Sequence, residues 1–229
     1  MRKPERLPPD KLAPFQWTPA GDAARLRWGA GPATDAPPEP PNRLDWVEIY
    51  GNGNPVEIEV GFGKGLFLVT SATANPDTNY FGVEIVRKYQ LYATDRLARQ
   101  NLTNARTCCA DAARVMRDHV VPGSVAAVHV YFPDPWWKAR HKKRTLFTPD
   151  FAGLVVNVLA PGGVLHFATD VPDYADMVAE VLAAVPELVP LPPPTEQPPE
   201  HDMDYLTNFE RRFRKLGKPI RRSRHLRRS

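Results

Sequence analysis

Short apolar runs alternate along this chain with longer segments in which apolar side chains recur at helical spacing. The continuous apolar run at 125–132 is typical of a strand that is buried on both faces of a parallel sheet. The segment 86–101 places Tyr89, Ala93 and Leu97 on one face of a helix. The pattern predicts strands at 55–60, 80–83, 106–110, 125–132 and 164–168. It predicts helices at 66–74, 86–101, 112–120, 149–160 and 173–185.

Strands and helices that alternate in this way predict an α/β fold with a doubly wound, mostly parallel sheet. In such sheets the ligand binds beyond the carboxyl ends of the strands. Local signals bound one helix closely, because Thr148 can cap it, Pro149 suits its first turn, and the Pro-Gly-Gly at 161–163 should end it.

Prolines divide the chain into regions. Ten of the 26 prolines lie in the leader, residues 1–43, which we therefore expect to be irregular. Its aromatic residues are expected to anchor it to the main domain: Phe15, Trp17 and Trp28. Seven more prolines predict a long loop at 186–200, inside a main domain that spans 44–217.

Positive charge is concentrated at the end of the chain. Residues 211–229 contain ten Lys and Arg and no acid; subtracting these ten charges from the net +4 leaves about −6 for residues 1–210. A basic stripe on an acidic body is the charge pattern of a nucleic-acid binder. A solvated terminal segment has the same composition, so the charge alone does not decide between the two.

The sequence offers no metal site and no membrane segment. Its two cysteines, Cys108 and Cys109, are adjacent and match no zinc-ligand spacing, and no two histidines are spaced as ligands. No run of 18 apolar residues and no signal-peptide core occurs. We therefore expect a cytoplasmic protein that binds neither metal nor membrane.

Three glycines follow the first predicted strand and open the next helix. Gly61, Gly63 and Gly65 would let the backbone turn tightly and approach a ligand closely. A glycine trio alone is a weak signal, but its position between a strand and a helix strengthens it. We expect these glycines to contact a cofactor.

Four carboxylates lie at the ends of four successive predicted strands: Glu59, Glu84, Asp111 and Asp134. Glu84 could accept hydrogen bonds from both ribose hydroxyls, Asp111 from an adenine amino group, and Glu59 could face a positively charged amino group. Four negative charges would repel a triphosphate and suit S-adenosylmethionine, which carries an amine, a ribose, an adenine and a sulfonium. The glycines and Glu84 also fit a nicotinamide-dependent oxidoreductase, and these two features alone do not distinguish the two functions.

The stretch from 131 to 144 suggests chemistry on a nucleobase. Asp134 lies between two prolines, which restrict its backbone, and two tryptophans that can stack on bases follow. Cations that can bind phosphate come next: Lys138, Arg140, Lys142, Lys143 and Arg144. A solvated charge run would look similar.

Taken together, these segments resemble the bacterial tRNA (guanine-N7)-methyltransferases, over roughly residues 55–217. The resemblance rests on EIEVGFGKG (57–65), FGVE (81–84), FPDPWWKARHKKR (132–144), ATD (168–170) and TNFERRF (207–213). The FPDPW and TNFE segments are its specific part. The resemblance implies a Rossmann-like class I fold that depends on S-adenosylmethionine and methylates N7 of a guanine in the tRNA variable loop.

The resemblance also assigns roles. It places the cofactor at the four carboxylates, and it makes Asp134 the catalytic residue, which would orient the guanine and offset its developing charge, with proton abstraction from N1 as a second possibility. It implies substrate binding by Lys138, Asp170, Thr207, Asn208, Phe209 and Glu210. It implies RNA contacts by Arg140, His141, Lys142, Lys143, Arg144 and Thr145. Thr207 and Glu210 could equally form a helix capping box.

The end of the chain departs from this family, which usually closes with an apolar strand. Residues 218–229 contain only two large aliphatic side chains, so we expect a basic tail or an exposed edge strand guarded by charge. An RNA-binding module without catalytic activity is a further alternative. Monomer and homodimer both remain open.

Overall fold

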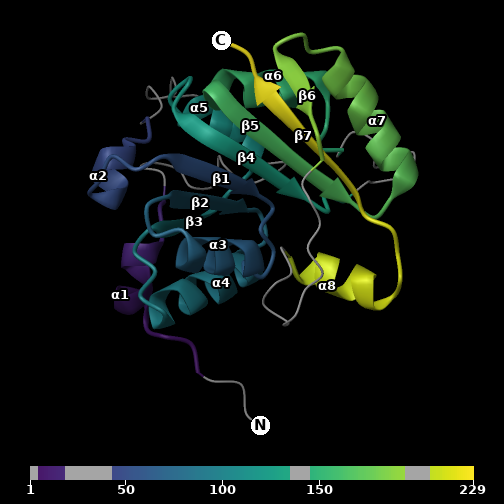
Figure 1. Cartoon of the computed structure of the whole chain (residues 1–229). Helices are drawn as coiled ribbons and strands as arrows, with labels where there is room; N and C mark the ends of the chain where they lie inside the picture. The colour runs from purple at the N-terminus through teal and green to yellow at the C-terminus, as the bar shows by residue number, and fades with distance from the viewer. Residues whose placement is uncertain (1–4, 19–42, 135–144, 194–206) are drawn as a thin grey trace, which may run out of the picture.

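The computed structural model describes residues 5–18, 43–134, 145–193 and 207–229. Its centre is a seven-stranded sheet in the order β3-β2-β1-β4-β5-β7-β6 (Figure 1). The strands are β1 (Val56–Val60), β2 (Asn79–Glu84), β3 (Ala105–Cys109), β4 (Val125–Tyr131), β5 (Leu159–Thr169), β6 (Leu188–Leu191) and β7 (Arg221–Arg227). β1 to β5 are parallel, and β7 is antiparallel to β5 and β6. The expected α/β fold with a mostly parallel sheet is confirmed.

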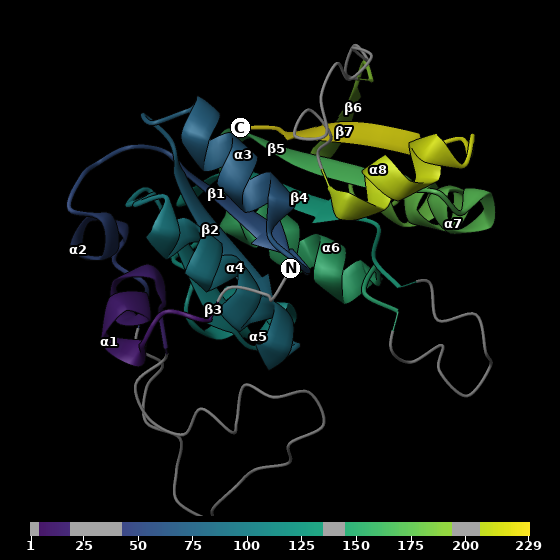
Figure 2. The same cartoon turned by 90° about the horizontal axis from the view of Figure 1, so that it is seen from below.

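Helices cover the sheet on two faces (Figures 1 and 2). One apolar core packs α3 and α4 against β2 and β3, and a second packs α5, α6 and α7 against the opposite face. The helices are α1 (Pro9–Leu12), η1 (Ala13–Phe15), α2 (Trp46–Tyr50), α3 (Leu66–Ala74), α4 (Arg87–Arg99), α5 (Ala112–Asp118), α6 (Pro149–Val158), α7 (Pro172–Ala183) and α8 (Asn208–Lys215). The strands between these two layers are largely buried, and a few polar side chains, such as Glu59 and His129, are buried with them.

Every predicted strand and helix occurs, most of them within two residues of the predicted bounds. The Thr148 hydroxyl accepts a hydrogen bond from the Phe151 amide at 3.1 Å and so caps α6 as expected. One boundary is wrong: β5 begins at Leu159, five residues before the predicted strand at 164–168. The Pro-Gly-Gly segment is an irregular part of the strand, where the register against β4 shifts.

The structure corrects the prediction for the end of the chain. Residues 221–227 form β7, which lies between β5 and β6 and is neither a free tail nor an edge strand. The outer position belongs to β6, which lies inside the segment that we predicted to be a loop. Pairing on both sides satisfies the backbone of β7, and that gain does not depend on apolar side chains.

Three arginines of β7 donate hydrogen bonds to other parts of the fold. Arg222 donates to Glu210 at 2.6 Å, and Arg224 donates to the carbonyl of Pro192 at 2.8 Å through Nη2. Arg227 donates to the carbonyl of Leu159. A strand built in this way has a composition that sequence reasoning takes for a solvated tail.

The described part of the leader is partly ordered against the domain. Phe15 is buried beside α3 and α4, and the Trp17 amide donates to the Thr107 carbonyl at 2.9 Å. Trp17 also contacts Phe81 edge to face, with ring centroids 5.9 Å apart. Two of the expected aromatic anchors therefore touch the core, whereas Trp28 lies outside the described residues. Sequence reasoning did not predict α1 and η1.

Candidate active site at the carboxyl ends of the strands

The loop between β1 and α3 depends on its three glycines. Gly61, Gly63 and Gly65 have φ of 71°, 54° and 66°, a region that L side chains rarely adopt. A Cβ on Gly65 would lie 2.5 Å from the Cβ of Ala93, so this glycine lets α3 pack against α4. A Cβ on Gly61 or Gly63 would meet no atom within 4 Å. These two glycines therefore border open space, and a ligand can approach their backbone.

Glu84, at the end of β2, fixes the geometry of this loop. Its Oε2 accepts from the Gly63 amide and its Oε1 from the Val86 amide, both at 2.8 Å. The side chain is buried, and burial raises the pKa of the carboxyl, with a further rise from the negative charge of Asp134. Glu84 is thus a buried acid whose remaining lone pairs border the glycine loop.

Three of the four predicted acids line one cavity of about 360 Å³: Glu84, Asp111 and Asp134. Asp111 is the N-cap of α5, and its Oδ1 accepts from the Ala113 amide at 2.9 Å. Capping uses one oxygen and leaves the other oxygen available. Gly61 and Gly63 line the same cavity, and apolar residues such as Val86 and Leu146 complete its wall.

Asp134 is exposed at the rim of this cavity, after the end of β4. Two residues earlier the backbone is unusual, because Phe132 has a φ of 52° although it is not glycine. The Phe132 amide donates to the Ala168 carbonyl at 2.8 Å, and its ring lies 5.6 Å from that of Phe213 in α8. These contacts hold the backbone in this conformation and direct the following Pro133–Asp134 segment toward the cavity.

Glu59 lies within β1 and lines an adjoining cavity of about 430 Å³. It is 3% exposed, and its Oε2 has no hydrogen-bond partner among the described residues. Burial raises the pKa of Glu59 well above its usual value, and the charge of Glu84 raises it further. A buried acid with a free oxygen on a cavity is suited to a ligand group that carries positive charge.

The cationic side of this second cavity comes from α8 and the glycine loop. Lys64, Arg211, Arg212 and Lys215 line it together with Phe209, which is 48% exposed. Sequence reasoning treated the charges of α8 as a general basic stripe. Their placement beside the glycine loop depends on how α8 folds back over the sheet.

The TNFE segment serves the structure as well as the cavity. The Thr207 hydroxyl accepts from the Glu210 amide at 3.0 Å and caps α8, which is the Thr207 half of the predicted capping box. Glu210 is buried, and its Oε1 accepts from Arg214 at 2.8 Å and from Arg222 at 2.6 Å. This network holds α8 against β7. Among Thr207, Phe209 and Glu210, the aromatic ring is therefore the most available to a ligand.

The other predicted substrate residues are more dispersed. Asp170 follows β5 and pairs with Lys218, with Oδ2 and Nζ 3.5 Å apart. Thr145 is described and does not line either cavity. Asn208 begins α8. The remaining predicted contacts lie outside the described residues: Lys138, Arg140, His141, Lys142, Lys143 and Arg144.

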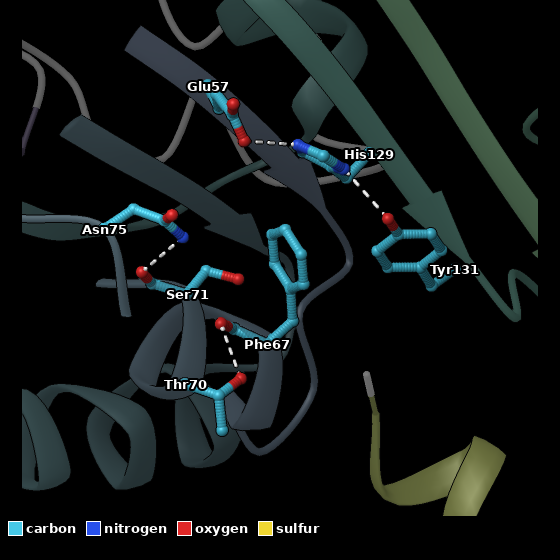
Figure 3. Close-up of polar contacts among 7 residues, drawn as sticks. All are labelled: Glu57, Phe67, Thr70, Ser71, Asn75, His129 and Tyr131. Atoms are coloured by element: carbon cyan, nitrogen blue, oxygen red, sulfur yellow. Dashed lines mark hydrogen bonds and ion pairs between the residues drawn. The ribbon is translucent and has the colours of Figure 1, made fainter. Parts of the chain in front are cut away.

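Sequence reasoning missed Tyr131 at the end of β4. It lines both cavities, and its hydroxyl lies 2.9 Å from Nδ1 of His129 (Figure 3). His129 Nε2 in turn lies 2.7 Å from Oε2 of Glu57. The alternation Glu57–Glu59 and His129–Tyr131 along neighbouring strands was a usable signal, since residues two apart share a face.

Neither a metal centre nor a membrane span occurs among the described residues. No cluster of three or more His, Cys, Asp or Glu in this part of the chain could hold a metal ion. No helix in the described ranges is long and apolar enough to cross a membrane.

Solved structures identify the class of fold. The chain is similar to the 16S rRNA methyltransferase KamB, with a TM-score of 0.57 and 16% identity over 80% of this chain and 92% of that one. It is also similar to the 16S rRNA (adenine(1408)-N(1))-methyltransferase from Catenulisporales acidiphilia, with a TM-score of 0.55 and 17% identity over 82% and 94%. At this identity the likeness concerns the fold alone, which is that of a Rossmann-like methyltransferase.

Sequence relatives identify the family. Residues 53–223 match the family model Methyltransf_4, described as "Putative methyltransferase". The tRNA (guanine-N(7)-)-methyltransferase of Rhodopirellula baltica is 45% identical over 193 residues, which are 81% of this chain and 71% of that protein. The enzyme of the same name from Haemophilus influenzae (strain PittGG) is 41% identical over 178 residues, or 76% and 71%. The chain belongs to the tRNA (guanine-N7)-methyltransferase family, which favours the methyltransferase prediction over a nicotinamide-dependent one.

Proposed function

We propose that this protein transfers a methyl group from S-adenosylmethionine to N7 of a guanine in the tRNA variable loop, in the cytoplasm. One observation carries the proposal. A chain of this family brings Glu84, Asp111 and Asp134 together on one cavity, beside glycines whose backbone a ligand can approach.

The cavity residues fit S-adenosylmethionine by their chemistry. Glu84 would accept from the ribose hydroxyls and Asp111, through its second oxygen, from the adenine amino group. The free Oε2 of Glu59 would accept from the ammonium group. A bound cation would also favour the ionised form of Glu59, which burial disfavours. The solved methyltransferase from Catenulisporales acidiphilia contains its cosubstrate S-adenosylmethionine, which supports this class of ligand here.

The reaction requires little acid–base catalysis by the protein. S-adenosylmethionine supplies, when bound, a methyl group that is already activated on a positively charged sulfur. Guanine N7 carries a free lone pair, so no proton has to leave the attacking atom. The main task of the protein is to hold N7 in line with the methyl carbon, which can contribute about 7 kcal/mol or more.

Asp134 would position the guanine. Its carboxylate is exposed at the rim of the cavity and can accept from guanine N1–H and the amino group. Its negative charge would also offset the positive charge that develops on the purine. Phe209 is half exposed at the border of both cavities and offers a face on which the base can stack.

The tRNA backbone would meet positive charge near this rim. Lys64, Arg211, Arg212 and Lys215 lie along the second cavity. The cations of 138–144 follow Asp134 directly in the chain. Together these cations can neutralise several phosphates of the tRNA.

A methyl-transfer assay on unmodified tRNA tests the proposal. Labelled methyl from S-adenosylmethionine should appear in tRNA, and strand scission specific for N7-methylguanine should cut at one variable-loop position. A matched tRNA with adenosine at that position should accept no label there. Stable tRNA binding without any transfer would instead support the RNA-binding module, and label at another base or position would refute the assigned reaction.

A further inference from the structure

Three polar side chains on neighbouring strands form a hydrogen-bonded chain along one face of the sheet, next to the site. Glu57 on β1, His129 on β4 and Tyr131 at the end of β4 point to the same face of the sheet (Figure 3). The Oε2 of Glu57 lies 2.7 Å from Nε2 of His129, and Nδ1 of His129 lies 2.9 Å from the Tyr131 hydroxyl. His129 is 5% exposed, so the central link is shielded from water. Such a chain holds its members rigidly in place.

Tyr131 keeps an acceptor position whichever way its contact with His129 runs. A protonated phenol oxygen carries one hydrogen and two lone pairs. The contact with Nδ1 of His129 uses either the hydrogen or one lone pair. A protonated Tyr131 therefore keeps at least one lone pair that can accept from a further group.

The surroundings of Tyr131 keep it in this form. Burial raises the pKa of Tyr131, and the nearby charges of Glu59 and Glu57 raise it further, so the phenol remains protonated. Its ring packs against Phe67, with centroids 5.3 Å apart, and against His129 at 5.6 Å. The hydroxyl is thus rigidly held, and a rigid acceptor costs little entropy when a ligand binds to it.

The position of Tyr131 indicates what it would bind. It lines the cavity of Glu84 and Asp111 as well as the cavity of Glu59, at the place where the two meet. Glu59 contributes an unpartnered buried oxygen to the same region. Two acceptors beside each other, one of them acidic, suit a donor that carries several hydrogens and a positive charge, and an ammonium group has both properties.

We propose that the Tyr131 hydroxyl oxygen is a second acceptor, beside Glu59, for the ammonium group of the aminoacyl part of S-adenosylmethionine. Glu57 and His129 hold the Tyr131 hydroxyl at this place through their contacts. The inference rests on the proposed function, since it names a contact to the same cofactor. Glu57 is part of the EIEVGFGKG motif, but the resemblance assigned no role to any of these three residues.

Two nucleoside ligands distinguish the loss of this contact from a general disruption of the binding site. S-adenosylhomocysteine carries the ammonium group, and 5′-methylthioadenosine keeps the nucleoside and thioether but lacks it. In calorimetry, Tyr131→Phe should weaken the binding of S-adenosylhomocysteine about tenfold, which is the effect of losing one hydrogen bond to a charged group. It should change the affinity for 5′-methylthioadenosine less than about twofold. The phenylalanine keeps the ring contacts, and equal melting temperatures would confirm an intact fold.

Tyr92→Phe is the matched control, because Tyr92 is 49% exposed on α4 and lines neither cavity. It should leave both affinities unchanged. Equal weakening of both ligands by Tyr131→Phe, or no weakening of either, would overturn the inference while leaving the proposed function intact. Wild-type protein that binds neither nucleoside would overturn both proposals.

Discussion

The ionised form of Glu59 should oppose stability and support cofactor binding at the same time, and Glu59→Gln separates the two effects. The variant keeps the shape of the side chain and removes the charge that burial disfavours. The folded-state pKa of Glu59 is raised, so the folded protein binds more protons than the unfolded chain between the two pKa values. Its stabilising contribution is therefore complete below the unfolded pKa and is lost as the pH rises through the folded pKa.

The magnitude follows from the unpartnered oxygen. A buried polar group without a partner costs about 1–3 kcal/mol, and the glutamine amide keeps part of that cost. We expect Glu59→Gln to raise the free energy of unfolding by about 1 kcal/mol at pH 8, and to give no advantage at pH 4, where the glutamic acid is protonated. The same change should weaken the binding of S-adenosylhomocysteine about tenfold or more, because a charge-assisted hydrogen bond is lost.

Urea denaturation at both pH values, with calorimetry at pH 8, measures both effects. Glu180→Gln is the control, since Glu180 is exposed on α7 and should alter neither quantity. A variant that is less stable than wild type at pH 8 would show that the hydrogen bond from the Leu68 backbone to Glu59 outweighs the cost of burying the charge. Unchanged binding of S-adenosylhomocysteine would remove Glu59 from the cofactor site.

Three further changes test other parts of the site. Gly65→Ala should lower the free energy of unfolding, measured in urea, by about 2–5 kcal/mol, because of its positive φ and the overlap with α4. Gly61→Ala has only the backbone cost of about 1–2 kcal/mol. Equal losses in the two variants would contradict the role of Gly65 in packing α3 against α4. Asp134→Asn should lower kcat about 100-fold or more with little change in tRNA affinity, and an equal loss in both would argue against an orienting role. Replacing Lys142 and Lys143 by Ala should reduce the slope of log affinity against log salt by about 1.4–1.8, and an unchanged slope would exclude phosphate contacts there.

Local signals explain why the first part of the fold was predictable. The helix 66–74 was predicted with the bounds of α3, because it follows the glycine loop and opens with four apolar residues, 66–69. Thr148 and Pro149 marked the start of α6 through cap and first-turn chemistry that involves neighbours only. Acids at the ends of parallel strands meet at one edge of a sheet, so the order of strands along the chain was enough to group Glu84, Asp111 and Asp134.

Long-range pairing explains what was not predictable. The arginines of β7 appear solvated in the sequence, and they find Glu210 and backbone carbonyls only after the strand has entered the sheet. The same holds for β6, which sequence composition indicated to be a loop. In both cases the hydrogen bonds of the sheet outweighed weak strand propensity.

The sequence by itself determined the order of strands and helices, the glycine loop and the chemical types of the residues at the site. These depend on side-chain periodicity and on turn chemistry between near neighbours. Only the tertiary structure decided that α8 brings its cations to the glycine loop, and that Glu57 on one strand orients His129 and Tyr131 on another. Those relations join residues more than 70 positions apart, and no local pattern specifies which of them will meet.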